Sequence, residues 1–303
     1  MIGLVRLNIE CIGADCDDAA AILYLLGKMK AGECEIKAIT LCTCRKFASA
    51  AAKAFVTEFG YGEIPIGEYK GKPLPCDGFD HYAEVVAGGV PIKAENAVKI
   101  MRKTLAENDK TDIICIGPAC NIAGLLESGA DEYSDKRGEE LVKERVGKLY
   151  LMGGAFEFSE VEKPFAEWNI EQDIESAKTV FEKFPCEIVI CPSEAGARVA
   201  TKARSTKGLT RKAMEAFFKS IDERGGVKYE ENPERTRPSW DPLTCMAAMN
   251  EKEFSFSEKG EVKVSDDGYT EFIKTETGKC RYMTLKNDFK KAKKELNEYL
   301  ETL

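Results

Sequence analysis

The stretch from residue 2 to residue 26, IGLVRLNIECIGADCDDAAAILYLL, decides the fold of this chain. Its first part, Ile2 to Ile12, is an apolar run that predicts a buried strand. Its last part, Ala19 to Leu26, predicts a helix whose N-terminus lies at the Asp pair Asp17-Asp18. The acidic residues between them therefore lie at the carboxyl end of a first strand, where open α/β sheets bind ligands.

Asp15, Asp17 and Asp18 place three carboxylates within four positions. Carboxylates this close repel one another, and a hard cation is the usual means of holding them together. The alternative is that Asp17 or Asp18 caps the following helix. A cap needs one acid, so the cluster favours a metal or polar-ligand site.

The rest of the chain alternates apolar runs with helical patterns. The predicted strands are 35–42, 64–67, 112–116, 148–152 and 187–191, and the predicted helices are 47–59, 94–106, 121–127, 174–184, 211–220 and 241–249. This rhythm predicts an α/β fold with an open, mostly parallel sheet and helices on both faces. Residues 254–285 predict antiparallel hairpins at a sheet edge, and residues 286–303 predict a charged amphipathic helix. With no linker evident, we expect residues 1–303 to form a single domain.

The composition limits the kinds of partner that the protein can bind. The chain of 303 residues is 44% hydrophobic and 32% charged, with a net charge of −8, which argues against nucleic acid or an anionic membrane as partner. A small neutral or cationic ligand fits better. The start of the chain lacks the pattern of a signal peptide, and no apolar run is long enough to span a bilayer, so we expect a cytoplasmic protein. Its 12 cysteines are then expected to be reduced thiols.

Polar residues follow each predicted strand, and in a parallel sheet they meet at one edge. These segments are 11–18, 42–44, 117–121, 152–154 and 193–194, together with Glu167-Trp168-Asn169 and Ser239-Trp240-Asp241-Pro242. Acids, amides and carbonyls suit a hard divalent cation and a polyhydroxylated ligand. Taken alone, Asn121 or Asp241 would be interpreted as a helix cap. Of three long connections, 69–90, 156–167 and 222–238, we expect the first two to be functional.

Six short motifs carry a family resemblance. They are DCDDA (15–19), GPACNIAGLL (117–126), LMGGAF (151–156), AEWNIEQDIESAKTVF (166–181), SEAGARV (193–199) and RPSWDPLTCMAAM (237–249). In this order they resemble the inosine-uridine nucleoside hydrolase family, in a divergent bacterial branch. The resemblance implies a nucleoside-hydrolase-like, Rossmann-type architecture and a calcium-dependent enzyme that hydrolyses the N-glycosidic bond of a ribonucleoside. It also implies a homo-oligomer.

The resemblance assigns roles to individual residues. Calcium would be held by Asp15 and Asp18 of the first motif, by the backbone carbonyl of Cys120 and by Asp241. The ribose would be contacted by Asp17, Glu167 and Asn169. These roles agree with the chemistry, because nearby carboxylates stabilise an oxocarbenium-like transition state and a metal activates the attacking water.

The sequence departs from the family where the general base is expected. Ile9 and Cys11 stand in place of the two upstream aspartates, and neither side chain can do that work. We therefore hypothesise that Asp15 or Glu10 is the base. Trp240 replaces the family's histidine and could stack on a nucleobase or pack in the core. His81, the one histidine in the sequence, could supply the proton instead.

The cysteines leave a further alternative open. Cys11, Cys16, Cys42, Cys44 and Cys120 all fall at predicted strand ends, where they could fill space or form a soft-metal site. The leading hypothesis is a calcium-dependent nucleoside hydrolase. The alternatives are a catalytically impaired family member that binds a nucleoside or another sugar-containing ligand, and a thiolate-rich metal protein.

Overall fold

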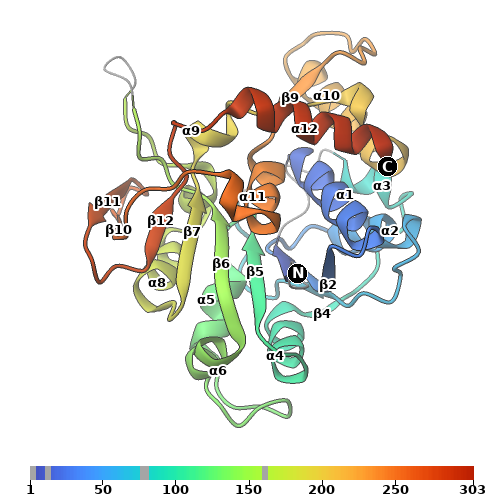
Figure 1. The fold of residues 1–303 in the computed structure, drawn as a ribbon. Coiled ribbons are helices and arrows are strands. Elements are labelled where there is room, and N and C mark those ends of the chain that lie inside the picture. The colour runs from blue at the N-terminus through green and yellow to red at the C-terminus, as the bar shows by residue number, and fades with distance from the viewer. Residues whose placement is uncertain (1–4, 11–14, 76–81, 159–162) are drawn as a thin grey trace.

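The computed structural model describes residues 5–10, 15–75, 82–158 and 163–303 (Figure 1). In this part of the chain a ten-stranded sheet has the order β11-β10-β12-β7-β6-β5-β1-β2-β3-β4, and β8 pairs separately with β9. The strands are β1 Val5–Glu10, β2 Cys34–Leu41, β3 Ile66–Glu68, β4 Glu95–Asn96, β5 Thr111–Cys115, β6 Val146–Met152, β7 Glu187–Cys191, β8 Ala200–Lys202, β9 Thr236–Pro238, β10 Gly260–Val264, β11 Thr270–Lys274 and β12 Cys280–Tyr282.

The sheet is mostly parallel, as the sequence predicts. The pairs that link β7, β6, β5, β1, β2, β3 and β4 are all parallel. The expected antiparallel edge is also confirmed, since β10 runs antiparallel to β11 and to β12. β12 itself joins β7 in parallel. The mixed edge therefore continues the parallel sheet without a separate layer.

Helices cover both faces of the sheet (Figure 1). They are α1 Asp17–Lys30, α2 Ala48–Glu58, α3 Ala83–Val86, α4 Ala97–Glu107, α5 Cys120–Glu127, α6 Gly138–Arg145, α7 Trp168–Gln172, α8 Ile174–Lys183, α9 Ser193–Gly196, α10 Gly208–Arg224, α11 Trp240–Met249 and α12 Phe289–Thr302, with short 3-10 turns η2 Ala203–Ser205 and η3 Glu251–Glu253.

Alternation along the central strands divides the core into two. Tyr150 and Val189 belong to one cluster with side chains of α1, α2, α10, α11 and α12. Their neighbours Leu149 and Ile188 belong to the other cluster, with side chains of α4, α5, α6 and α8. Because β6 and β7 are buried on both faces, their sequences are mostly apolar, which is the pattern that predicts these strands.

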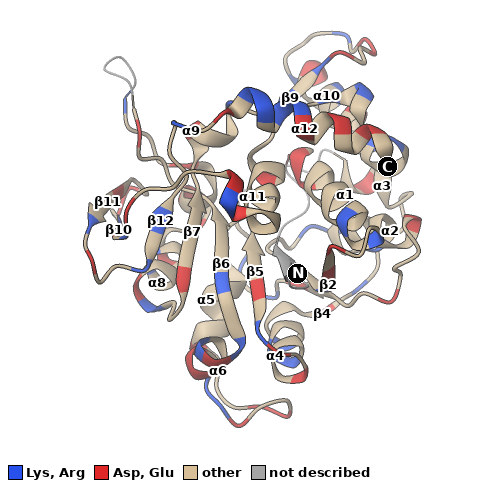
Figure 2. Cartoon of the chain, viewed as in Figure 1, with Lys and Arg blue, Asp and Glu red and all other residues tan. Residues whose placement is uncertain are grey.

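Several elements differ from the sequence prediction. α6 was not expected, because its sequence GEELVKER is dominated by charge and buries few residues against α4 and α5. The N-terminus of the first helix does lie at the Asp pair as predicted, since α1 starts at Asp17 and both aspartates lie in its first turn. The expected C-terminal helix is α12, on which both charge signs appear (Figure 2). Within the described residues, no helix has the length and apolar character needed to cross a membrane.

Candidate active site

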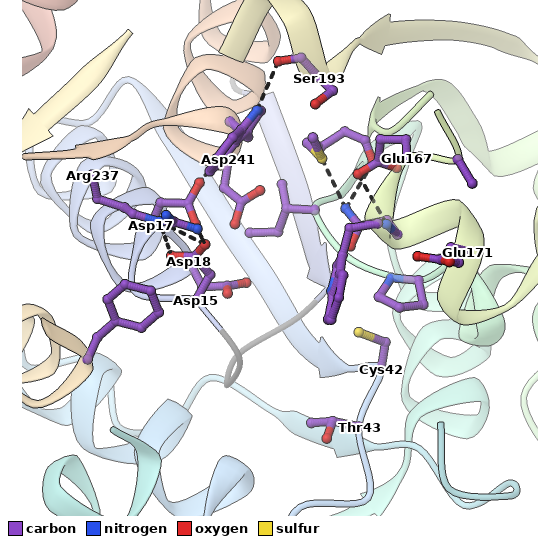
Figure 3. A pocket seen from close by; sticks show the side chains of 18 of the residues that line it. Asp15, Asp17, Asp18, Cys42, Thr43, Glu167, Glu171, Ser193, Arg237 and Asp241 are labelled. Carbon is purple, nitrogen blue, oxygen red and sulfur yellow. Dashed lines mark hydrogen bonds and ion pairs between the residues drawn. The ribbon is translucent and has the colours of Figure 1, made fainter. Parts of the chain in front are cut away.

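A cavity of about 600 Å³ opens at the carboxyl ends of the parallel strands (Figure 3). Its lining includes residues that follow five strands: Asp17 and Asp18 after β1, Cys42 and Thr43 after β2, Ile116 and Pro118 after β5, Met152 at the end of β6 and Ser193 after β7. The predicted convergence of these strand ends is therefore confirmed. A cavity of this size suits a small polar ligand.

Three buried aspartates form the acidic centre of the cavity. Asp17 and Asp18 lie in the first turn of α1, and Asp241 lies in the first turn of α11. One carboxylate oxygen from each lies within 4.8 Å of the others, and the three residues are at most 4% exposed. The backbone N–H of Asp241 donates to Oδ2 of Asp17 at 3.2 Å. Two helix N-termini thus face one acidic cluster, and their dipoles stabilise its charge.

The cluster concentrates negative charge in a buried place. Burial raises the pKa of the Asp17 carboxyl well above its usual value, and the charge of Asp15 raises it further, against the opposing effects of Arg237 and the Asp241 N–H. Calcium binds oxygens at about 2.4 Å, so two oxygens on one ion can lie up to about 4.8 Å apart. The Asp17, Asp18 and Asp241 oxygens meet this spacing, and carboxylates are hard ligands. The residues present therefore fit a hard divalent cation.

Asp15 lines the same cavity but is paired with an arginine. Nε of Arg237 donates to Oδ1 and Oδ2 of Asp15 at 2.8 and 2.9 Å, and Nη2 also donates to Oδ2. Both oxygens therefore accept from the guanidinium, and Asp15 is not part of the three-aspartate group. Its expected roles as calcium ligand and as general base both stay predictions.

Glu167 lies across the cavity from the aspartates (Figure 3), and Asn169 also lines the cavity. Glu167 caps α7 and accepts from three backbone N–H groups, those of Asn169, Ile170 and Gly154. Burial raises the pKa of Glu167 to about 7, although these three bonds act in the opposite direction. Asn169 donates through Nδ2 to the Met152 carbonyl at 3.3 Å. Both residues line the cavity, and their expected contacts with ribose stay predictions.

Trp240 begins α11 and is half-buried at the cavity wall. Its Nε1 donates to the carbonyl of Ser193 at 2.9 Å. The ring packs directly on Gly196, where an added Cβ would lie 2.2 Å from Cδ1 of Trp240. The residue is therefore packed and also reaches the cavity, so both interpretations of it remain open.

The other predicted site residues are placed less directly. His81 and Cys11 lie outside the described residues, and Glu10 ends β1 beside Thr40 of β2 in the parallel register. Cys120 begins α5, and its thiol donates to the carbonyl of Cys42 at 3.8 Å.

The thiols do not join the acidic centre. Among the described residues, the one group of three side chains with metal-binding spacing consists of carboxylates, without a cysteine. Cys16 is fully buried and Cys42 lines the cavity, while Cys44 is exposed. The thiol positions therefore lend no support to a soft-metal site.

The sequence assigns no role to several of the residues that line the cavity. Phe217, Ile221 and Arg224 come from one face of α10, at spacings of four and three residues. Phe165 comes from the connection 156–167, which the sequence predicts to be functional, and Arg237 comes from β9. The helical spacing on α10 was readable, but nothing in it shows that this face borders the cavity.

The fold is shared with solved nucleoside hydrolases. The plant nucleoside hydrolase PpNRh1 superposes with a TM-score of 0.72 at 19% identity, over 99% of each chain. A purine-preferring ribonucleoside hydrolase from Gardnerella vaginalis gives a TM-score of 0.72 at 19% identity, over 98% of each chain. The type III effector protein XopQ, complexed with adenosine diphosphate ribose, gives 0.72 at 14% identity, over 100% of this chain and 93% of its own. No curated protein sequence matches the chain.

Fold and acidic site together define an α/β protein of the nucleoside hydrolase type. The family model "Inosine-uridine preferring nucleoside hydrolase" matches residues 11–297, and the chain belongs to this family. The family and fold support an enzyme whose general chemistry is N-glycosidic hydrolysis.

Proposed function

We propose that this protein hydrolyses the N-glycosidic bond of a ribonucleoside or a related N-riboside, with calcium as its cation. The observation that carries the proposal is the cavity itself. One cavity is lined both by the buried acids Asp17, Asp18 and Asp241 and by Glu167 and Asn169. A single ligand in it can therefore contact a bound cation and hydrogen-bonding groups at the same time. The proposal also includes a single domain over residues 1–303, a cytoplasmic location and a homo-oligomer.

The acidic cluster would hold the cation through Asp18 and Asp241, with the Asp17 carboxylate beside them facing the sugar hydroxyls. A bound cation would orient these hydroxyls and lower the pKa of a water molecule. Cys120 contributes its carbonyl oxygen in this proposal, as the family resemblance implies.

The chain's own residues supply the remaining steps. Glu167 and Asn169 position the ribose from the opposite wall. Asp15 or Glu10 takes the proton of the attacking water, and His81 is the candidate proton donor. As the C1′–N bond breaks, positive charge develops on the ribose, and the surrounding carboxylates stabilise it.

The test is release of free base from a panel of ribonucleosides, followed by chromatography. We expect release by the wild-type protein with calcium and a loss of at least about 100-fold in kcat/KM for Asp241→Asn. Asp288→Asn is the matched control, because Asp288 also lies at a helix start, as the N-cap of α12, but does not line the described cavity. Release of no base from any nucleoside would contradict the proposal.

A second candidate function rests on one observation. Both oxygens of Asp15 accept hydrogen bonds from Arg237, which leaves this candidate base engaged. A family member that binds a nucleoside without hydrolysing it would show this arrangement. Tight binding of a ribose analogue by calorimetry, with no base released, would favour this function over hydrolysis.

A further inference from the structure

The bond that breaks in the proposed reaction leaves its electron pair on a nitrogen of the nucleobase. This developing negative charge needs a proton or a cation close by. Trp240 lines the cavity, but its one N–H is committed to the carbonyl of Ser193 at 2.9 Å. An indole N–H is moreover a donor that does not give up its proton. Trp240 therefore offers the leaving base no acid.

Arg237 lies in the same corner of the cavity. Its guanidinium carbon is 5.0 Å from the centre of the Trp240 ring and 5.1 Å from that of Phe217. Nε and Nη2 donate to Asp15, as Figure 3 shows. Within the described part of the chain, Nη1 makes no hydrogen bond. The Arg237 side chain is 30% exposed and lines the cavity. The two rings and the Asp15 carboxylate therefore hold its guanidinium, a cationic hydrogen-bond donor, at the cavity wall.

The guanidinium stays charged. Burial acts to lower the pKa of Arg237, but the ion pair with Asp15 and the charge of Asp17 outweigh it, so the pKa is raised above its usual value. Such a group cannot transfer a proton in a reaction. It can only stabilise negative charge by its own charge and by donating hydrogen bonds.

We propose, on the basis of the function proposed above, that Arg237 is a catalytic residue for departure of the nucleobase, donating through Nη1 to the leaving base. The oxygen of water bonds to C1′, and its proton passes to a carboxylate. The C1′–N bond breaks, and its electron pair stays on the base. The base leaves as an anion paired with the guanidinium and takes its proton only afterwards, from solvent or from the candidate donor His81. In this proposal the charge of Arg237 does the work that an acid at position 240 would otherwise do.

The test compares two substrates of one sugar. A nucleoside such as inosine or uridine has a poor leaving group, whereas 4-nitrophenyl β-D-ribofuranoside releases a stable anion that needs no help. For Arg237→Gln we expect kcat/KM to fall about 10²- to 10³-fold on the nucleoside and less than about tenfold on the nitrophenyl riboside. Arg237→Lys keeps the charge, and we expect a smaller selective loss. Melting curves confirm that each variant is folded.

Arg235→Gln is the matched control. Nη1 of Arg235 donates to Oδ2 of Asp222 at 2.6 Å, and its guanidinium carbon lies 4.4 Å from the centre of the Phe218 ring. Arg235 thus has the same kind of surroundings as Arg237 but does not line the described cavity. We expect less than about a threefold change on either substrate. Arg45→Gln and Arg224→Gln test the two other arginines of the cavity wall.

Each contrary result has its own meaning. An equal loss on both substrates in Arg237→Gln would show that Arg237 only holds Asp15, and this overturns the inference while hydrolysis stands. A leaving-group-dependent loss in the Arg45 or Arg224 variant, and not in the Arg237 variant, also overturns it. A wild-type protein that hydrolyses neither substrate overturns the proposed function as well.

Discussion

Replacing Asp18 by Asn should stabilise the protein in the absence of metal ions. Asp18 shares the acidic cluster with Asp17 and Asp241, with oxygens within 4.8 Å of one another. At an effective dielectric constant of about 20, each pair of charges at this distance repels by about 3.5 kcal/mol. Asp18 takes part in two such pairs, which sum to about 7 kcal/mol.

Proton uptake limits that cost. Protonating a carboxyl of ordinary pKa at pH 7.5 costs about 5 kcal/mol, and burial already raises the pKa of Asp17, so proton uptake at Asp17 keeps the repulsion within the cluster below this value. The asparagine also loses a favourable charge at the N-terminus of α1, worth about 0.5 to 1 kcal/mol. The expected gain for Asp18→Asn is therefore about 2–4 kcal/mol, and for 303 residues a gain of 3 kcal/mol raises Tm by about 5 °C.

The assay is thermal unfolding in EDTA and in a calcium titration. The free energy of unfolding of wild-type protein should rise by about 2.7 kcal/mol when calcium reaches 100 times its Kd, and that of Asp18→Asn should rise far less. In the control Asp288→Asn, the new residue can still cap α12 by accepting from the Lys291 N–H, so its Tm should stay within about 1 °C of the wild-type Tm both in EDTA and in calcium. The reasoning is refuted if Asp18→Asn melts no higher than wild type in EDTA and responds equally to calcium.

Three further predictions follow from single contacts. Burial raises the pKa of Glu167 to about 7. The free energy of unfolding of wild type, relative to that of Glu167→Gln, should therefore fall by about 3 kcal/mol as the pH rises from about 4.5 to about 7. Urea unfolding measures this difference, and a difference that does not change with pH contradicts the prediction. Arg102 is 2% exposed and pairs with Asp131 at 2.7 Å, so Arg102→Met should cost about 3–5 kcal/mol without changing kcat, and a cost below about 1 kcal/mol would count against it. Gly196→Ala should cost about 1–3 kcal/mol and shift the tryptophan emission, because the new Cβ would meet Trp240; an unchanged spectrum speaks against this contact.

The sequence predicts the sheet and the edge that carries the site. Asp18 and Asp241 are far apart in the chain, yet both follow signals that mark strand ends or helix starts. In a parallel α/β sheet these points converge by geometry, so the cavity edge is predictable without coordinates. The buried strand Glu187–Cys191 is predicted with its observed bounds, because both of its faces are covered and its sequence is apolar after the first residue.

The pairing inside the cavity is not predictable in the same way. Arg237 and Asp15 meet across most of the chain, and no periodicity specifies which carboxylate an arginine in a connection will reach. The position of Trp240 depends on the close approach of Gly196, a contact between α11 and α9 that propensity does not encode. These long-range contacts turn an acidic motif into a cluster of three aspartates with a fourth held apart by an arginine.

The most direct test of the central claim is calcium-dependent hydrolysis by metal-stripped protein. Purified protein is treated with EDTA, calcium is added back in steps, and the release of free base from a ribonucleoside panel is followed. The prediction is that no base is released without calcium and that activity returns when calcium is added to wild-type protein, but not when it is added to Asp241→Asn. Full activity in the stripped protein, or none at any calcium concentration, would contradict it.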